Sequence, residues 1–216
     1  MDKDFVFNID DNIINIFSNS IDDIKKKYKI TDYYELTQIH STNTIIVDNN
    51  YINKTVGDAL ITNKINTPLV IKIADCIPIL LYDNKNKVIA VIHSGWKGTL
   101  NNIVINTLNI MISKYNSKTE NISAYLYPSI RKCHFEVEED VYKLFKNKVN
   151  NINKYTTKKT NKYYIDLQQI VIDNLKENNI TNIHDSGICT YCHNDIYYSY
   201  RYNHTDKRNY LLVMLK

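Results

Sequence analysis

The stretch that decides the fold is PLVIKIADCIPILLYDNKNKVIAVIHSGWKG, residues 68–98. Its apolar runs are rich in β-branched residues and predict three strands, at 68–73, 79–82 and 88–93. The polar tetrapeptide at 83–86 is typical of a turn. Because the runs are almost entirely apolar, we expect strands that are buried on both faces.

A helix is expected directly after this stretch. Gly95 and Gly98 bracket a tight turn, and the apolar residues beyond it recur near helical spacing. These residues are Leu100, Ile103, Val104, Leu108 and Met111.

Further strands and helices follow towards the end of the chain. Strands are expected at 122–126, 163–165, 196–202 and 210–215. Asp166 is a typical N-cap residue and predicts a helix that begins after it. One more helix face is predicted from Val137, Val141, Leu144 and Phe145.

The order of these elements predicts the fold class. The polar segment 146–162 reads as a surface loop, and no domain boundary or internal repeat is evident. Strands and helices do not alternate regularly along the whole chain. We therefore expect one α+β domain over residues 1–216, with a mixed, layered β-sheet and helices packed outside it.

The composition excludes several classes of protein. Hydrophobic residues make up 44% and charged residues 23% of the 216, which argues against disorder of the whole chain. No apolar run approaches the ~20 residues that cross a bilayer, and the polar start does not predict a secretory signal. Four cysteines are too few for a disulfide scaffold, so we expect a reducing, cytoplasmic setting. The net charge of +4 is mild and not clustered, so we expect no nucleic-acid and no membrane partner.

Three reactive side chains stand near the expected strands. We expect His40 to follow a strand and turn, Cys76 to follow the strand at 68–73, and His93 to end the strand at 88–93. Such strand ends tend to meet at one rim of a sheet, where binding sites are common. One Cys and two His suit a zinc ion with an open coordination position. The same residues also suit a cysteine nucleophile with a histidine base, and spacing alone does not decide between these hypotheses.

A second group of candidate ligands gives a weaker signal. Cys189 and Cys192 form a single CxxC with His193 beside it, whereas a structural zinc site normally shows a second pair. Cys133 and His134 can supply that pair only through a long-range contact that the sequence does not show. We therefore favour no metal at this CxxC.

Basic residues near possible turns are candidate anion ligands. Lys97 lies at the expected start of a helix, where free backbone N–H groups and the helix dipole favour an anion. Arg201 and Arg208 belong to a set of only three arginines and lie among polar groups near the chain end. Arginine grips phosphate or carboxylate with two parallel hydrogen bonds. The simpler alternatives are surface ion pairing for Arg201 and Arg208 and a solvated lysine in a turn for Lys97.

Several motifs, taken together, identify the chain as similar to a known family. They are Gln38-Ile39-His40, Gly57-Asp58-Ala59-Leu60-Ile61-Thr62, Ala74-Asp75-Cys76-Ile77-Pro78, His93-Ser94-Gly95-Trp96-Lys97-Gly98, Ile165-Asp166-Leu167 and Tyr198-Ser199-Tyr200-Arg201. The chain resembles the YfiH/YlmD laccase-domain family, also described as multicopper polyphenol oxidases and as purine nucleoside phosphorylases. The resemblance spans roughly residues 36 to 214.

The resemblance implies a fold shared with certain cysteine-hydrolase toxins and a zinc site made by His40, Cys76 and His93. It implies phosphorolysis of adenosine, inosine and methylthioadenosine, with adenosine deamination as a further activity. Purine nucleosides and phosphate would then be the partners, with Lys97, Arg201 and Arg208 as substrate-binding candidates. Asp75 is the candidate acid/base group, with anchoring of the Cys76 turn as the alternative. We expect a monomer or a weak homo-oligomer.

The chain also departs from the family pattern. The N-terminal segment is short, and the family's Thr-Arg-x-Gly-Gly loop has no counterpart. Lys97 replaces a common Arg, and Tyr202 stands where a second Arg is typical. The metal-ligand candidates are all retained, so metal binding is a more secure expectation than the identity of the substrate.

Three other functions are considered beside the phosphorylase. A cysteine hydrolase or amidase, linked to the cell wall, would use Cys76 as nucleophile and His93 as base. Copper-dependent phenol oxidation is less favoured, because six histidines are too few for a multicopper centre. The non-enzymatic alternative is an accessory protein that holds zinc or associates with RNA.

Overall fold

The computed structural model describes residues 3–216, in which strands and helices follow one another without a regular repeat. The strands are β1 (Ile13–Ser18), β2 (Thr44–Ile46), β3 (Ala59–Thr62), β4 (Leu69–Ile73), β5 (Ile77–Asp83), β6 (Val88–Ser94), β7 (Ile122–Leu126), β8 (Glu136–Val137), β9 (Thr156–Lys159), β10 (Lys162–Ile165), β11 (Asn182–Asp185) and β12 (Asn209–Leu215). The α-helices are α1 (Ile21–Tyr28), α2 (Trp96–Leu100), α3 (Ile103–Tyr115), α4 (Glu139–Lys148), α5 (Leu167–Glu177) and α6 (Tyr200–Asn203).

A six-stranded mixed sheet forms the centre of the protein. Its strand order is β11-β7-β5-β6-β3-β2, with parallel pairs at the two edges and antiparallel pairs inside. Every residue of β5 and β6 is buried, which confirms the expectation of strands covered on both faces. The three strands expected in residues 68–98 are all present, as β4, β5 and β6.

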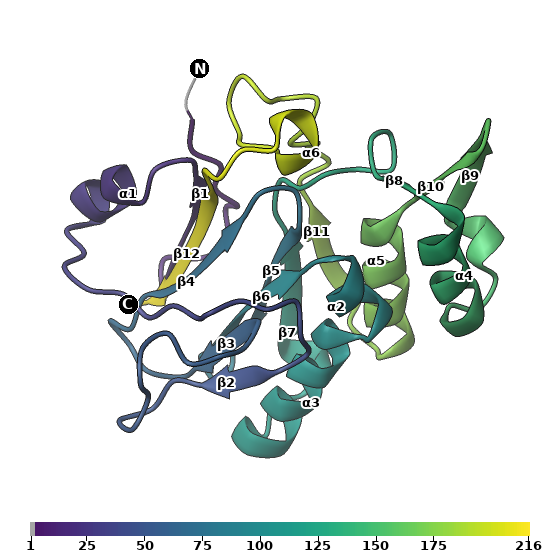
Figure 1. Ribbon diagram of the computed structural model, residues 1–216. Helices are drawn as coiled ribbons and strands as arrows, with labels where there is room; N and C mark the ends of the chain where they lie inside the picture. Colours follow the sequence, from purple (N-terminus) through teal and green to yellow (C-terminus); the bar gives the residue numbers. More distant parts are fainter. Residues whose placement is uncertain (1–2) are drawn as a thin grey trace.

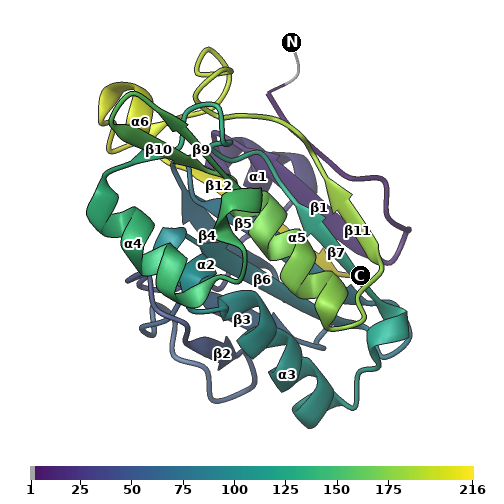
Figure 2. The same cartoon turned by 90° about the vertical axis from the view of Figure 1, so that its right-hand side faces the viewer.

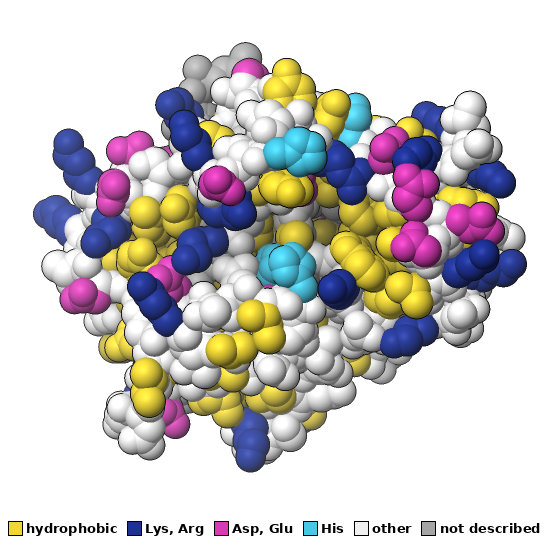
Figure 3. All heavy atoms as spheres, in the orientation of Figure 1, with side chains coloured by type: hydrophobic (Ala, Val, Ile, Leu, Met, Phe, Trp, Pro, Cys, Tyr) yellow, Lys and Arg dark blue, Asp and Glu magenta, His cyan; other side chains and the backbone are white. Residues whose placement is uncertain are grey.

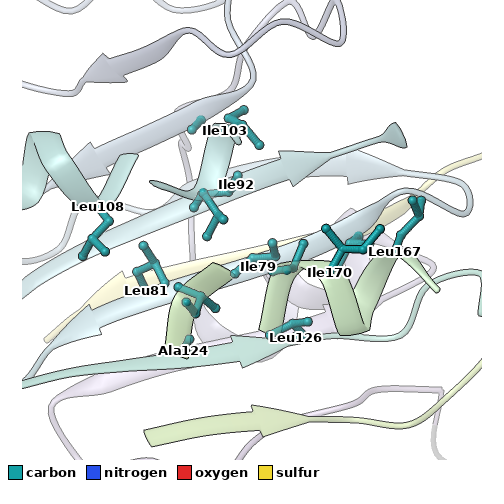
Figure 4. Close-up of a cluster of buried hydrophobic side chains, with 14 of the residues drawn as sticks. Ile79, Leu81, Ile92, Ile103, Leu108, Ala124, Leu126, Leu167 and Ile170 are labelled. Atoms are coloured by element: carbon teal, nitrogen blue, oxygen red, sulfur yellow. The ribbon is translucent and has the colours of Figure 1, made fainter. Parts of the chain in front are cut away.

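Alternate residues of the central strands belong to two different cores, because successive side chains of a strand point to opposite faces. Ile79, Leu81 and Ile92 pack in the core between the sheet and helices α3 and α5, as Figure 4 shows. Their neighbours Leu80 and Val91 belong to a second core on the other face. A shift of the strand register by one residue would exchange the two cores, so this alternation specifies the pairing.

A three-stranded antiparallel sheet of order β1-β12-β4 closes the second core. Helix α1 covers the outer face of this sheet, where Ile24 packs against Ile16 and Leu212. Seen from the side, the molecule is therefore layered as helix, sheet, sheet and helices (Figure 1). This arrangement confirms the expected α+β class with a mixed, layered sheet and flanking helices.

Local sequence explains where the helices begin. The Ser20 side chain accepts a hydrogen bond from the Asp23 N–H at the start of α1. Asp166 caps α5 in the same way, by accepting from the Gln169 N–H at 3.0 Å, as expected from the sequence. Asn102 adopts a left-handed backbone (φ +58°) and separates α2 from α3, so the single helix expected after residue 98 is divided in two.

The segment 146–162, expected to be a surface loop, is partly ordered into regular structure. It contains the end of α4, a short 3-10 turn at Ile152–Lys154 and strand β9, which pairs with β10. Ile152 and Tyr155 are buried against the main core, and these two anchors hold an otherwise polar segment. With β8, these strands form a small third sheet beside α4 at the right-hand end of the molecule in Figure 1, the end that faces the viewer in Figure 2.

Two further local expectations were wrong, and a third was correct only in part. The segment 196–202 is not a strand, because Ser199 caps a short helix by accepting from the Tyr202 N–H. No strand precedes His40, where residues 35–40 form only an isolated bridge between Thr37 and Val56. The helix expected at 137–145 is present as α4, and its Phe145 and Val141 pack on the core, but Val137 lies in β8 instead and Leu144 is 46% exposed.

Within residues 3–216, none of the helices is both long enough and apolar enough to span a lipid bilayer.

Candidate metal and substrate site

The structure brings His40, Cys76 and His93 together. One potential ligand atom of each lies within 4.8 Å of the others. The Cys76 Sγ atom is 3.8 Å from His40 Nε2, and the two imidazole centroids are 4.8 Å apart. His40 is exposed and His93 is buried, so the three donors sit at a boundary between core and solvent.

Strand pairing places two of these residues side by side. In the β5–β6 hairpin, Pro78 is opposite His93, and Cys76 lies just before β5 begins. Asp75 has a positive φ of +87°, which turns the chain between β4 and β5. His40 also has a left-handed backbone, with φ of +60°, in the loop that reaches over the end of β6.

Asp58 holds the site together, although sequence reasoning had not selected it as a functional residue. Its side chain is completely buried, and Oδ1 is 2.8 Å from His93 Nδ1. The same carboxylate accepts from the His40 N–H at 2.9 Å and from both the N–H and the hydroxyl of Ser41 at 2.6 Å. Asp58 therefore orients the His93 ring, leaves its Nε2 as the ligand atom, and fixes the loop that carries His40.

Position 95 requires a glycine because the side chains of His40 and Cys76 lie very close to its Cα atom. A Cβ atom at this position would lie 2.7 Å from His40 Cδ2 and 3.1 Å from Cys76 Sγ. The backbone conformation at Gly95 is extended and open to any residue. The need for glycine therefore arises from the space that the two donor side chains occupy.

The charged forms of Cys76, His93 and Asp58 stabilise one another. Burial alone would raise the pKa of the Cys76 thiol, but His93 and His40 outweigh this effect and lower it from 9.0 to about 6. Burial would lower the pKa of His93, yet Cys76 and Asp58 raise it from 6.5 to about 9. Burial also opposes ionisation of Asp58, but hydrogen bonds from His93 and Ser41 bring its pKa to about 2. In the metal-free protein at neutral pH, this lowered pKa favours the thiolate of Cys76, the form that binds metals and attacks electrophiles.

A cavity of about 770 Å³ opens beside the three donors. Its volume lies within the range of small-molecule sites. The wall combines apolar groups such as Trp96 with basic side chains, and a hollow with both kinds of side chain around it is visible on this face in Figure 3. The basic residues are Lys54, Lys72, Arg201 and Arg208.

The three candidate anion ligands have different positions. Arg201 and Arg208 line the cavity. Lys97 is exposed, its ammonium group lies 5.6 Å from the centre of the Trp96 ring, and it is not among the described residues that line the cavity. Helix α2 has only five residues, so its N-terminus is too weak a dipole to form an anion site together with Lys97.

Asp75 lines the cavity but has structural partners on both carboxylate oxygens. The Thr190 hydroxyl donates to Oδ1 at 2.7 Å, and the Arg201 N–H donates to Oδ2 at 2.6 Å. These bonds tie the turn before Cys76 to the segment that carries Arg201. The geometry favours the anchoring alternative over acid/base chemistry.

The remaining cysteines also meet. Cys133 and His134 lie beside Cys189 and Cys192, with one potential ligand atom from each within 4.8 Å of the others. The sequence favours no metal at the CxxC, because it shows a single CxxC and does not reveal this long-range contact. The structure contains the contact and so removes that objection.

The fold and the site together define a class: a single-domain α+β protein with a Cys/His donor set beside a cavity that lies where β4 and β6 end. The chain belongs to the family described as multi-copper polyphenol oxidoreductase laccase, whose model matches residues 5–216. This match begins well before residue 36, so the N-terminal strand is part of the family domain.

Related sequences are named for a different reaction. A protein of Rickettsia prowazekii (strain Madrid E) named purine nucleoside phosphorylase is 33% identical over 184 residues, covering 84% of this chain and 75% of the relative. A protein of Borreliella burgdorferi with the same name is 35% identical over 168 residues, covering 77% and 72%. These matches confirm the resemblance found from the motifs.

Two solved structures show the same fold. YfiH of Bacillus licheniformis superposes with a TM-score of 0.84 at 23% identity, covering 90% of this chain and 79% of that protein. YlmD of Geobacillus stearothermophilus superposes with a TM-score of 0.87 at 15% identity, covering 95% and 93%.

Proposed function

We propose that this protein is a zinc-dependent purine nucleoside phosphorylase that acts on adenosine, inosine and methylthioadenosine. Adenosine deamination is proposed as a further activity. The observation that carries the proposal is a single cavity that contains the donors His40, Cys76 and His93 together with Arg201 and Arg208. Relatives at 33–35% identity that are named purine nucleoside phosphorylase support the reaction class.

The donor set fits a zinc ion. Zinc prefers imidazole nitrogen and thiolate sulfur, and three protein ligands leave one position open for water or substrate. The bond between Asp58 and His93 matches the carboxylate partner that metal-ligating histidines usually have. Bound here, zinc would supply Lewis acidity and lower the pKa of a coordinated water. Two His and one Cys also suit copper, so the bound metal must be identified directly.

Phosphorolysis needs a phosphate held beside the nucleoside. A phosphate oxygen forms a bond to ribose C1′ while the bond from C1′ to purine N9 breaks, and the purine leaves with the electron pair and takes up a proton. Arg201 Nη1 donates to the carbonyls of His134 and Glu136, at 3.3 and 2.9 Å, and this fixes the guanidinium group. Among the described residues, its other nitrogens have no protein acceptor and are available to phosphate oxygens.

Arg208 completes the cationic wall. Its Nη1 donates to the carbonyls of Thr205 and Lys207, so this side chain is also held in place. Hydrogen-bond donors that are already held in place stabilise the charge that develops in a transition state, because they do not have to move during the reaction. Trp96 and Tyr200 line the same cavity and offer flat aromatic surfaces to the purine.

A second candidate function is a cysteine hydrolase or amidase, favoured by one specific geometry. Asp58 bonds to His93, which in turn lies beside Cys76, in the order of an orienting acid, a base and a nucleophile. Here the Cys76 thiolate would attack an amide carbonyl, and His93 would donate a proton to the leaving amine. For this hydrolase, the substrate class considered is an amide of the cell wall.

Copper-dependent phenol oxidation is the weakest alternative. The six histidines do not gather into one centre: within residues 3–216, His40 and His93 share one donor cluster and His134 belongs to another. A multicopper centre requires many imidazoles close together, and this arrangement does not supply them.

The test is chromatography of the products formed from inosine and adenosine, with and without phosphate. The protein is loaded with zinc, and its metal content is measured first. We expect phosphate-dependent release of hypoxanthine and adenine, together with ribose 1-phosphate. Formation of inosine from adenosine without phosphate would report deamination. No turnover by protein that holds stoichiometric zinc would refute the phosphorylase, and amide hydrolysis by metal-free protein would favour the hydrolase.

Two neighbouring cations provide a matched pair of variants. Arg208→Gln removes a cation from the cavity wall, whereas Lys207→Gln removes an exposed cation one residue away. We expect Arg208→Gln to raise the KM for phosphate by about 10- to 100-fold, equivalent to one charge-assisted hydrogen bond. Lys207→Gln should leave it unchanged. Equal effects of the two substitutions would show that the cavity wall does not bind phosphate.

A further inference from the structure

A second cluster of potential metal ligands lies outside the cavity. Cys133 and His134 belong to the loop between β7 and β8, and Cys189 and Cys192 belong to the segment between β11 and α6. Residues more than fifty positions apart in sequence therefore supply one ligand atom each to a group within 4.8 Å. Cys133 and Cys192 are exposed, so an ion can reach the cluster from solvent.

Four distances between these ligand atoms lie within about 0.3 Å of the edges of a tetrahedron around a zinc ion, and the other two are below 4.8 Å. Cys133 Sγ is 3.7 Å from Cys189 Sγ and 3.8 Å from Cys192 Sγ. His134 Nδ1 is 3.2 and 3.3 Å from the sulfurs of Cys133 and Cys192. Zinc bonds of about 2.3 Å to sulfur and about 2.0 Å to nitrogen place tetrahedral ligand atoms roughly 3.5–3.8 Å apart. A disulfide would require sulfurs about 2.05 Å apart, and all four cysteines are free.

The surroundings hold the ligands in this arrangement. Tyr191 stacks on the His134 ring with centroids 3.9 Å apart and fixes its plane. The Arg131 N–H donates to Cys189 Sγ at 3.4 Å, and such N–H donors commonly support metal-bound thiolates. A β-bridge between Ser129 and Cys189 sets the two segments side by side before any metal binds.

We propose that Cys133, His134, Cys189 and Cys192 form a structural zinc site, separate from the cavity donors. Four protein ligands complete a tetrahedral shell and leave no position for substrate, which is the pattern of structural zinc. The site would join the β7–β8 loop to the segment before α6. This inference does not depend on the proposed enzymatic reaction.

The position of the cluster indicates what such a site would stabilise. The His134 carbonyl accepts from Arg201 Nη1, so the ligand loop also holds the cavity arginine. Thr190, between two of the ligands, donates to Asp75 beside Cys76. The metal would thus stabilise the cavity wall without touching the substrate.

The experiment uses a full-length variant in which the cavity donors are removed, His40→Ala with Cys76→Ser. Zinc is counted by elemental analysis after dialysis against a weak chelator. We expect this variant to retain one zinc ion per chain. Its cobalt derivative should show intense thiolate-to-cobalt charge-transfer absorption. A folded variant that retains no zinc would overturn the proposal, and this result would leave the cavity site untouched.

A matched pair of histidines tests the ligand assignment in the same background. His134→Ala should abolish zinc retention, whereas His193→Ala, beside the CxxC, should not. Cys192→Ser offers a second test at an exposed position that the fold should tolerate. Retention of zinc by both His134→Ala and Cys192→Ser would overturn the assignment. A mass lower by two hydrogens in the unreduced protein, with a disulfide mapped to these cysteines, would also overturn it.

Discussion

Replacement of Gly95 by alanine tests the geometry of the cavity donors with a single methyl group. The new Cβ atom would lie 2.7 Å from His40 Cδ2, whereas carbon atoms in contact prefer at least about 3.5 Å. The His40 ring must therefore retreat by roughly 0.8 Å. Metal–ligand distances tolerate about 0.2 Å, so this displacement removes His40 as a ligand.

The cost should fall on metal binding and hardly on folding. His40 is exposed, so its ring can swing into solvent with little loss of packing. Substitutions that only disturb hydrogen bonds behind a metal ligand already cost 10- to 100-fold in affinity, so we expect a loss of at least about 100-fold in zinc affinity. That factor corresponds to about 2.8 kcal/mol of binding free energy. The free energy of unfolding of the metal-free protein should change by less than about 1 kcal/mol.

The assay is competition for zinc with a chromophoric chelator, performed on the His134→Ala background so that only the cavity site is measured. Gly98→Ala, three residues further along in α2, is the control, because its Cβ would meet Ile103 Cγ2 at 3.2 Å and, at 3.7 Å, only the backbone oxygen of His93 rather than its ring. Zinc affinity of Gly95→Ala equal to that of Gly98→Ala, with both variants folded, would refute the geometric argument.

Three other changes have defined outcomes. Asp58→Asn should lower the free energy of unfolding by about 2–4 kcal/mol and weaken zinc binding about 10- to 100-fold, because an amide has one acceptor oxygen and places an NH2 group where the second carboxylate oxygen accepts. Chemical denaturation and chelator competition measure these changes, and wild-type values would argue against an orienting role. In metal-free protein, the rate of Cys76 alkylation should rise with pH to half its maximum near pH 6, since the lowered thiol pKa keeps the thiolate above that pH and protonation removes it below. Zinc should protect the thiol, and a midpoint near pH 9 would show that His93 does not stabilise the thiolate. Leu81→Ala should cost about 2–5 kcal/mol of stability in urea denaturation, whereas Leu144→Ala, at a half-exposed position, should cost less than about 0.5 kcal/mol; equal costs would contradict the observed core.

The central sheet could be predicted from the sequence because its information is local. The runs at 69–73, 77–83 and 88–94 combine β-branched residues with almost no polar interruption, and each forms a strand. The prediction failed at 196–202, where tyrosines favour a strand. There, Ser199 caps a helix and places Arg201 in the cavity wall. The Ser199 cap, together with the Asp75 carboxylate that accepts from the Arg201 N–H, satisfies this backbone in place of a neighbouring strand.

The segment 146–162 shows a different limit. Its Asn, Lys and Thr residues suggest a loop, and only Ile152 and Tyr155 are buried against the core. Two buried apolar residues in a polar segment do not produce the hydrophobic periodicity that predicts a strand or a helix. Their burial depends on where α4 and β10 are packed, which the segment itself does not encode.

The candidate site could be predicted only in part, because its organiser acts through tertiary contacts. His40, Cys76 and His93 were selected from their positions near strand ends. Asp58 was not, although an acidic residue directly before the apolar run 59–62 is a usable signal in the sequence. Its role depends on the pairing of β3 with β6, which places the Asp58 carbonyl 2.8 Å from the His93 N–H and the two side chains together.

The cysteine cluster is the clearest case of non-local information. Cys133 and Cys189 meet because β11 pairs in parallel with β7, so the loops that follow both strands leave the sheet at the same end. No feature of the CxxC motif alone reveals this partner. Any prediction of the contact requires the sheet topology first.

Anomalous X-ray scattering from crystals of the zinc-loaded protein, recorded on both sides of the zinc absorption edge, tests the central claim most directly. The account predicts a zinc peak within bonding distance of His40 Nε2, Cys76 Sγ and a nitrogen of His93, on the wall of the cavity that also contains Arg201 and Arg208. Absence of a peak between these three donors, in crystals whose chains carry zinc elsewhere, would contradict it.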